Sequence, residues 1–145
     1  MDEIDVARRC ADLMYSGDRA SQALGIEVEV TKAGTAEASM RIREDMVNGL
    51  SVCHGGLIFT LADTAFAFAC NGYDQQTFAA SAHIDFLRPA KLHDQLVATA
   101  TEDHRGRSTG YYLVKIKNQR NELVALFRGR SVSNGESMLQ DQSDT

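Results

Sequence analysis

Residues 57–70 read Leu-Ile-Phe-Thr-Leu-Ala-Asp-Thr-Ala-Phe-Ala-Phe-Ala-Cys, and this stretch decides the fold. It is apolar on every side of a helical projection and rich in alanine, a pattern typical of a helix that is buried all round. It is shorter than the roughly 20 residues that a helix needs to cross a bilayer. Asn71 and Gly72 follow it and are typical of a helix end. We therefore predict one buried helix at the centre of the fold.

The residues before this helix predict another helix and a hairpin. Apolar residues recur at helical spacing over residues 3–15, which indicates an amphipathic helix. Asp18 can cap a second short helical turn, and Gly25 can end it. Apolar and polar residues then alternate over residues 26–31 and 36–43, which indicates a β-hairpin with one polar face.

The residues after the helix predict mainly strands. Short polar links separate four β-rich stretches, which cover residues 77–87, 95–104, 108–117 and 123–132. Because the links are short, we expect these strands to pair in chain order as an antiparallel meander. One apolar helix and about six strands favour an α+β fold in which an antiparallel sheet curls around the helix. We predict a single domain over residues 1–145, with a core over roughly residues 20–132 and a frayed polar tail over residues 133–145.

The composition restricts the classes of protein to consider. The chain is 43% hydrophobic and 24% charged, as globular proteins are. Its N-terminus is acidic and has no apolar stretch like that of a signal peptide, and its three cysteines are widely spaced. The net charge is −5; residues 88–130 carry an excess of Lys and Arg, but no basic helix or nucleic-acid motif occurs. We expect a cytoplasmic protein with no nucleic-acid or membrane partner, whose basic segment suits a small anionic ligand or consists of solvated strand edges.

Asp63 is a carboxylate in the middle of the predicted buried helix. A charge in such a place is costly unless it is paired or used. The neighbours three and four residues away supply no positive charge, since they are Phe59, Thr60, Phe66 and Ala67. The residues alone leave two interpretations open: a catalytic carboxylate, or a structural one that pairs with a distant arginine or faces a wet groove.

A pair of glycines opens the same helix in the sequence Cys53-His54-Gly55-Gly56. Glycines let a ligand approach the backbone closely, and the free N–H groups of a first helical turn attract developing negative charge. This arrangement suits a thioester carbonyl that becomes an oxyanion. The alternative interpretation is an ordinary flexible helix entry.

Gly55 and Asp63 are separated by about 12 Å along a helix axis. A base and an oxyanion-binding amide must both reach one carbonyl, each within about 3 Å of its target. One helix therefore does not easily supply both groups to one substrate. We predict that Gly55 of one subunit faces Asp63 of another across a two-fold dimer interface, which creates two shared sites.

The segments around these residues resemble the hotdog-fold thioesterases of the PaaI type, which are associated with bacterial phenylacetate degradation. The resemblance rests on Asn48-Gly49-Leu50-Ser51-Val52-Cys53-His54-Gly55-Gly56 and on Leu61-Ala62-Asp63-Thr64-Ala65-Phe66-Ala67. Weaker similarity lies in Asp85-Phe86-Leu87-Arg88-Pro89 and in Ala125-Leu126-Phe127-Arg128-Gly129. The resemblance covers roughly residues 20–132.

The resemblance implies an antiparallel sheet wrapped around one long central helix, dimers that share active sites, and a tetramer built from two dimers. It implies that Asp63 is the general base or the nucleophile, and that the N–H of Gly55 polarises the thioester carbonyl. Asn48 would hold the carbonyl or the attacking water. His54 would shape the helix entry and contact the substrate.

Further residues are expected to contact the substrate. Gly56, beside Gly55, and Thr64, which would orient the site, belong to the family pattern, whereas charge and loop position suggest Arg88, Lys91 and Arg107 as contacts to the coenzyme A phosphates. The resemblance implies no metal, and no cofactor besides the coenzyme A of the substrate. We expect hydrolysis of phenylacetyl-CoA or its hydroxylated relatives by Asp-assisted attack of water rather than through a covalent anhydride. A medium-chain acyl-CoA substrate is the alternative.

Other functions are less favoured by the residues. Cys53 and His54 suggest a nucleophile and its base, but adjacent residues of an extended segment point to opposite sides. His83 and Asp85 share a face of a predicted strand, yet no third metal ligand occurs at a suitable spacing. A hotdog enoyl-CoA hydratase pairs an Asp with a His five positions later, and that position here is Phe68. A non-catalytic acyl-CoA sensor remains an alternative, although such proteins usually carry a DNA-binding domain, which this sequence does not show.

Overall fold

The computed structural model of this protein describes residues 1–143. Its helices are α1 (Glu3–Gly17), α2 (Arg19–Ala23), the 3₁₀ turn η1 (Glu44–Met46), α3 (Gly55–Cys70) and α4 (Met138–Ser143). Its strands are β1 (Glu27–Lys32), β2 (Thr35–Arg41), β3 (Thr77–Phe86), β4 (Gln95–Arg105), β5 (Thr109–Lys117) and β6 (Leu123–Ser133). The predicted helices and strands are thus confirmed, with ends that differ by about one or two residues. No helix among residues 1–143 has the length and apolar character needed to span a membrane.

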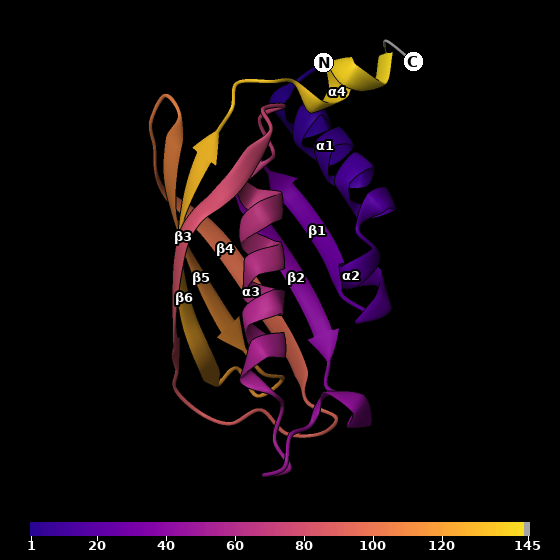
Figure 1. The fold of residues 1–145 in the computed structure, drawn as a ribbon, viewed down its shortest axis with the longest axis vertical. Helices are drawn as coiled ribbons and strands as arrows, with labels where there is room; N and C mark the ends of the chain where they lie inside the picture. Colours follow the sequence, from indigo (N-terminus) through magenta and orange to yellow (C-terminus); the bar gives the residue numbers. More distant parts are fainter. Residues whose placement is uncertain (144–145) are drawn as a thin grey trace.

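A single antiparallel sheet curls around α3, as the sequence predicts (Figure 1). The order of the strands is β1-β2-β4-β5-β6-β3, and every neighbouring pair is antiparallel. The helix lies in the concave face of this sheet. The fold is therefore the predicted α+β hotdog arrangement.

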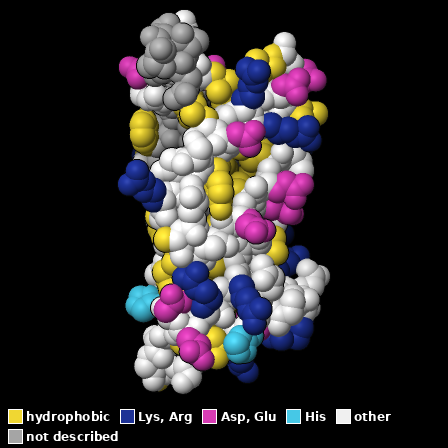
Figure 2. All heavy atoms as spheres, turned by 90° about the vertical axis from the view of Figure 1, so that its right-hand side faces the viewer, with side chains coloured by type: hydrophobic (Ala, Val, Ile, Leu, Met, Phe, Trp, Pro, Cys, Tyr) yellow, Lys and Arg dark blue, Asp and Glu magenta, His cyan; other side chains and the backbone are white. Residues whose placement is uncertain are grey.

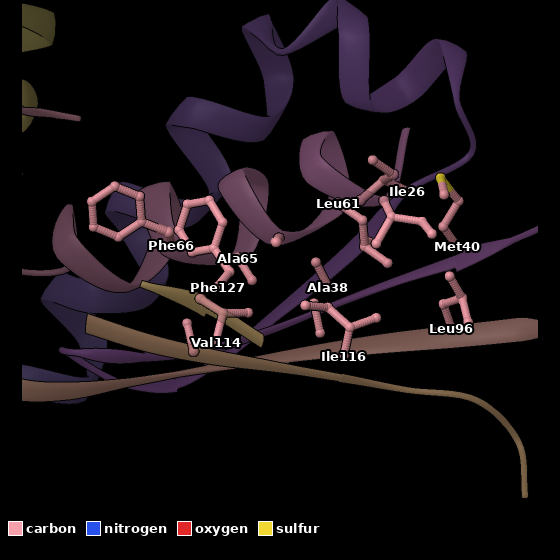
Figure 3. Close-up of a cluster of buried hydrophobic side chains, with 14 of the residues drawn as sticks. Ile26, Ala38, Met40, Leu61, Ala65, Phe66, Leu96, Val114, Ile116 and Phe127 are labelled. Carbon is pink, nitrogen blue, oxygen red and sulfur yellow. The ribbon is translucent and has the colours of Figure 1, made fainter. Parts of the chain in front are cut away.

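The core forms where α3 packs into the sheet. Figure 3 shows Leu61 and Phe66 of the helix among side chains of β5 and β6, including Ile116 and Phe127. All four of these side chains are at most 1% exposed. A Cβ on Gly129 of β6 would lie 2.8 Å from Cζ of Phe66, so the helix approaches the sheet closely at a position where only glycine fits.

The predicted meander of the last four strands is wrong for the first of them. β3 pairs with β6, and the two edges of β4 are taken by β2 and β5. The link over residues 87–94 is long enough for this, because eight extended residues reach roughly 26 Å and three strand spacings amount to about 14 Å. Hydrogen bonds hold this link across the end of the sheet, from the N–H of Cys53 to the carbonyl of Ala90 and from the N–H of His93 to the carbonyl of Ile42.

The N-terminal helices lie beside β1 (Figure 1). The hydroxyl of Tyr15 donates a hydrogen bond to the carbonyl of Ile26 at 2.6 Å, which ties α1 to the start of this strand. As predicted, Asp18 caps α2: its carboxylate accepts from the N–H of Ser21. Gly25 follows with a φ of 69°, in the left-handed region that favours glycine.

The C-terminal tail is more structured than predicted. Ser133 still belongs to β6, and α4 follows within the segment that we expected to be frayed. Figure 1 shows α4 next to the N-terminal end of α1. Residues 144–145 of the predicted tail lie outside the described residues.

β3 is an open edge of the sheet. It pairs with β6 on one side only, and nearly all of its side chains are exposed. Phe78 is 57% exposed and Phe86 is 53% exposed, which is unusual for aromatic side chains on a strand. A long, exposed edge strand is a template for pairing with a further strand.

Candidate active site

His54 caps α3. Its Nδ1 accepts a hydrogen bond from the N–H of Gly56 at 2.9 Å, and its carbonyl oxygen accepts one from the N–H of Leu57 at 3.0 Å. The N–H of Gly55 donates to no acceptor within residues 1–143. His54 therefore occupies one amide of the first turn and leaves the amide of Gly55 available to a ligand.

The ring of Phe86 lies against Gly55. A Cβ on Gly55 would be 3.2 Å from Cζ of Phe86, at the end of β3. A pocket of about 330 Å³ adjoins the two residues and is otherwise lined by Val52, Cys53, Ile58 and residues 87–90. The free amide thus lies beside a mainly apolar pocket at the N-terminal end of α3.

Asn48 organises the loop that leads to α3. Its Oδ1 accepts hydrogen bonds from the N–H groups of Leu50 at 2.9 Å and Val52 at 3.4 Å. A bridge between Val47 and Cys53 closes the loop. The side-chain nitrogen of Asn48 donates to no atom of residues 1–143, so this exposed donor is free to bind a carbonyl or a water.

The face of α3 that carries Asp63 is only partly buried. Gly56, Thr60, Asp63 and Ala67 follow one another at helical spacing, and all four are accessible to solvent, while the residues around them are mostly buried. The prediction of a helix buried all round is therefore wrong for this face. At Asp63 and Ala67 the helix borders a cavity instead of the sheet.

The carboxylate of Asp63 is half-buried and has no hydrogen-bond or ion-pair partner within residues 1–143. Burial removes water from this carboxyl and raises its pKa. The distant arginine that a structural role would require is not found in the described part of the chain. An unpaired carboxylate with a raised pKa is a better proton acceptor near neutral pH than an ordinary one.

The cavity beside Asp63 has a volume of about 490 Å³, within the range of small-molecule sites. Most of its lining is apolar. Besides Asp63, four elements contribute to it: Ala67 and Cys70 of α3, Phe78 of β3, Met14 of α1 and Met138 of α4. It extends along α3 from Asp63 toward the C-terminal end of the helix. The carboxylate therefore lies next to a space that can hold an apolar group.

One chain does not bring the two main candidates together. Gly55 opens α3, and Asp63 lies about 12 Å further along the helix axis. The pockets next to Gly55 and Asp63 share no lining residue. The prediction of a site shared by two subunits is consistent with this separation and stays a prediction.

The three basic candidates lie at different ends of the molecule. Arg88 and Lys91 are on the β3–β4 link, at the same end as Gly55, whereas Arg107 is on the β4–β5 link at the other end (Figure 1). Arg88 forms an ion pair with Glu122, while Lys91 is exposed. Arg107 of the same chain therefore cannot act together with Arg88 and Lys91.

Sequence reasoning did not identify three residues that the structure places near the candidates. Phe86 lies against Gly55, Met138 lines the cavity beside Asp63, and Thr60 lies one turn before Asp63 on the same face. The predicted Thr64 instead lies on the buried side of α3, where its hydroxyl donates to the carbonyl of Thr60 at 2.7 Å. Helical spacing would have found Thr60, but only tertiary structure reveals the other two.

Two alternative centres receive no support from the geometry. Burial raises the pKa of the Cys53 thiol to about 11, and Nδ1 of His54 is already bonded to Gly56. His83 and Asp85 form an exposed hydrogen-bonded pair at 3.2 Å. No group of three His, Cys, Asp or Glu side chains that could hold a metal occurs in the described part of the chain.

The surface shown in Figure 2 carries acidic and basic side chains side by side. Neither sign of charge forms a continuous face on this side of the molecule. A nucleic-acid surface would need a basic patch or stripe, which this side lacks.

Comparisons with known proteins relate this chain to thioesterases. Residues 50–125 match the family described as Thioesterase superfamily. The acyl-coenzyme A thioesterase PaaI of Escherichia coli K12 is 46% identical over 121 residues, which cover 83% of this chain and 86% of that protein.

Two solved structures are similar in fold and in sequence. The Escherichia coli PaaI protein from the phenylacetic acid degradation operon has a TM-score of 0.91 and 43% identity, with 94% of this chain and 99% of that chain covered. A mutant of the phenylacetic acid degradation protein PaaI from Thermus thermophilus has a TM-score of 0.76 and 33% identity, with 79% and 98% covered.

Proposed function

The chain belongs to the thioesterase superfamily and is a hotdog-fold thioester hydrolase of the PaaI type, and from this premise we propose that it hydrolyses aromatic acyl-CoA. The substrate we propose is phenylacetyl-CoA or a hydroxylated relative. One similar protein comes from the phenylacetic acid degradation operon, and another is a phenylacetic acid degradation protein. We place the enzyme in the cytoplasm, where its three free, buried cysteines suit a reducing environment.

The observation that carries this proposal is the position of Asp63. Its carboxylate is half-buried and unpaired within residues 1–143, and it borders an apolar cavity of about 490 Å³. A carboxylate that stabilises the fold by pairing would have a partner within the chain, and a carboxylate in a mainly apolar cavity is costly unless it is used. A general base beside an acyl-binding cavity accounts for both features.

We propose that water attacks the thioester in a step that Asp63 assists. The carboxylate takes a proton from the water as its oxygen bonds to the carbonyl carbon, and the carbonyl oxygen becomes an oxyanion that accepts from the N–H of Gly55. Collapse of this intermediate breaks the C–S bond and expels the coenzyme A thiolate, which takes up the proton. Asn48 supplies a further free donor to the carbonyl or the water. The chemistry needs no metal and no cofactor other than the coenzyme A of the substrate.

The two catalytic groups come, in this proposal, from two subunits. Pairing of the exposed β3 edges of two copies would satisfy the free backbone groups of this strand and cover Phe78 and Phe86. A two-fold contact of this kind creates two equal sites, each with Asp63 of one subunit and Gly55 of the other. Arg88 and Lys91 lie at the Gly55 end of the site and are our candidates for the coenzyme A phosphates. Family resemblance further suggests a tetramer of two such dimers.

Release of free thiol from a panel of acyl-CoA substrates tests the proposed function. We expect the highest kcat/KM for phenylacetyl-CoA or a hydroxylated form. A preference for straight acyl chains of medium length would contradict the aromatic substrate and support the alternative, a medium-chain acyl-CoA. Binding of acyl-CoA without any thiol release would refute the assignment as an enzyme of this substrate class.

Mixed dimers test the shared site. Gly55 is the first residue of α3, where proline is tolerated, and the preceding His54 has a ψ of 130°, which suits a residue before proline. Gly55→Pro therefore removes the amide N–H without breaking the helix. Gly55→Ala is the matched control, because it adds the same Cβ next to Phe86 but keeps the N–H. We expect both Gly55→Pro and Asp63→Asn to be inactive as pure proteins.

Refolding the two inactive variants together should restore activity. Each mixed dimer contains one site with an intact Gly55 and an intact Asp63, so random mixing should return about a quarter of the wild-type rate per chain. A site within one chain would give no recovery, because each chain then lacks one of its own groups. Light scattering on the same samples establishes whether dimers or tetramers are present.

A further inference from the structure

The cavity beside Asp63 is lined in part by residues from the two ends of the chain. Along α3 its lining runs from Asp63 to Cys70, about 10 Å of helix. Met14 of α1 and Met138 of α4 complete the lining. β6 ends at Ser133, and α4 begins at Met138. This helix is therefore an addition to the sheet and its central helix.

Asp74 fixes the position of α4. Its Oδ1 accepts hydrogen bonds from the N–H groups of Met138 and Leu139, both at 2.9 Å, and its Oδ2 accepts one from the hydroxyl of Ser137 at 2.8 Å. Asp74 has a φ of 55°, a left-handed conformation that is uncommon for residues other than glycine. The two consecutive amides and the hydroxyl hold the first turn of α4, and hence Met138, in one place.

Backbone hydrogen bonds attach the preceding residues to the start of β3. The N–H of Gln76 donates to the carbonyl of Glu136 at 2.7 Å, and the N–H of Asn134 donates to the carbonyl of Gln76 at 3.1 Å. Residues 77–79 of the next strand line the same cavity. The tail therefore reaches the cavity through a continuous set of contacts.

On the basis of the proposed function, we propose that α4 is the end wall of the acyl-binding cavity and that Met138 limits the length of the acyl group. A thioester carbonyl placed at Asp63 directs its acyl group along α3 toward Met138. A methionine side chain is flexible and fits closely around an aromatic ring. A phenylacetyl-sized group fits in the space before this wall, while a long straight chain meets it.

Kinetic selectivity tests this role. The measurement is the ratio of kcat/KM for dodecanoyl-CoA to kcat/KM for phenylacetyl-CoA. Met138→Ala should raise the ratio roughly tenfold or more, because one or more methylenes of space open at the end of an apolar pocket. Met138→Phe should lower kcat/KM for phenylacetyl-CoA, because the larger ring shortens the cavity.

Two further variants separate this role from general effects on α4. Leu139→Ala changes the next residue of the same helix, which does not line the cavity, and should leave the ratio unchanged. Asp74→Gly removes the carboxylate that holds α4 but keeps the left-handed backbone, so it should raise the ratio in the same direction as Met138→Ala. Urea unfolding of each variant confirms that the fold persists.

The outcomes distinguish this inference from the proposed function. An unchanged ratio in Met138→Ala, or an equal change in Leu139→Ala, overturns the role of Met138 while the wild-type activity still supports the thioesterase. A wild-type protein that releases thiol from no acyl-CoA overturns both. A raised ratio in Met138→Ala and Asp74→Gly, with Leu139→Ala like the wild type, supports the end wall.

Discussion

Nδ1 of His54 and the backbone N–H of Gly56 are 2.9 Å apart, so the histidine is the N-cap of α3. This bond fixes the first helical turn and so holds the free amide of Gly55 in position. The neutral ring must then carry its proton on Nε2, since Nδ1 is the acceptor. Histidine often serves as an acid or a base in other proteins. Here its role is structural: it caps the helix whose first amide, that of Gly55, we assign to the oxyanion.

We predict that His54→Ala destabilises the protein by about 1 kcal/mol through loss of the cap, and that its activity falls because the helix entry loosens. Asparagine is a good N-cap residue, so His54→Asn should recover both stability and most of the activity. Urea unfolding and steady-state thiol release measure the two effects. If His54→Asn regains stability but stays as slow as His54→Ala, the imidazole itself contacts the substrate and capping is not its main role.

We predict that the carboxylate of Asp63 raises kcat and lowers the free energy of unfolding at neutral pH. Asp63→Asn should lower kcat by roughly 10²- to 10⁴-fold, the usual contribution of a general base.

Because burial raises the pKa of this carboxyl, the folded protein binds the proton more tightly than the unfolded chain, and stability is lost as the pH rises through the raised pKa. Asp63→Asn should therefore be at least as stable as the wild type at neutral pH, and this advantage should disappear in acid.

Urea midpoints of the wild type and Asp63→Asn, measured at neutral pH and near pH 4, check this prediction. A variant that is less stable than the wild type at neutral pH would show that the carboxylate has a stabilising partner. An active, well-folded Asp63→Asn would remove Asp63 from the mechanism altogether.

The pH dependence of the rate should report the same carboxyl. A general base acts only when it is deprotonated, so kcat/KM should fall in acid with an apparent pKa above the ordinary value of 3.8. The residual rate of Asp63→Asn should lack this decline. A wild-type profile that stays flat down to the ordinary pKa, or a decline that persists in the variant, would contradict the assignment.

The sequence predicts the elements of the fold well because they depend on local patterns. Period-two alternation locates β1 and β2, and the apolar stretch over residues 57–70 locates α3. The partner of β3 does not follow from such patterns, since the link after it can reach either edge of the sheet. The exposed side chains of β3 identify it as an edge strand, but their exposure is known only from the folded structure.

The residues of the candidate site could be predicted where their type is unusual for the helix or strand that contains them. Asp63 in an apolar helix and the glycine pair before it are visible in the sequence alone. Phe86 and Met138 are ordinary apolar residues, and their contacts with Gly55 and with the cavity depend on how distant segments pack. For the same reason Arg107 could not be separated from Arg88 and Lys91 by its charge.

The close packing of α3 on β6 gives a prediction about stability alone. A Cβ at Gly129 would lie 2.8 Å from the ring of Phe66, which is 1% exposed and is held between Tyr112 and Phe127 at centroid distances of 5.5 and 5.7 Å. Because this ring cannot move aside, Gly129→Ala should destabilise the protein by about 1–3 kcal/mol. Gly17→Ala is the matched control, since a Cβ there meets nothing within 4 Å, and it should be neutral or slightly stabilising. Similar urea midpoints for the two variants would mean that the ring of Phe66 relaxes and that the helix is not held this tightly against the sheet.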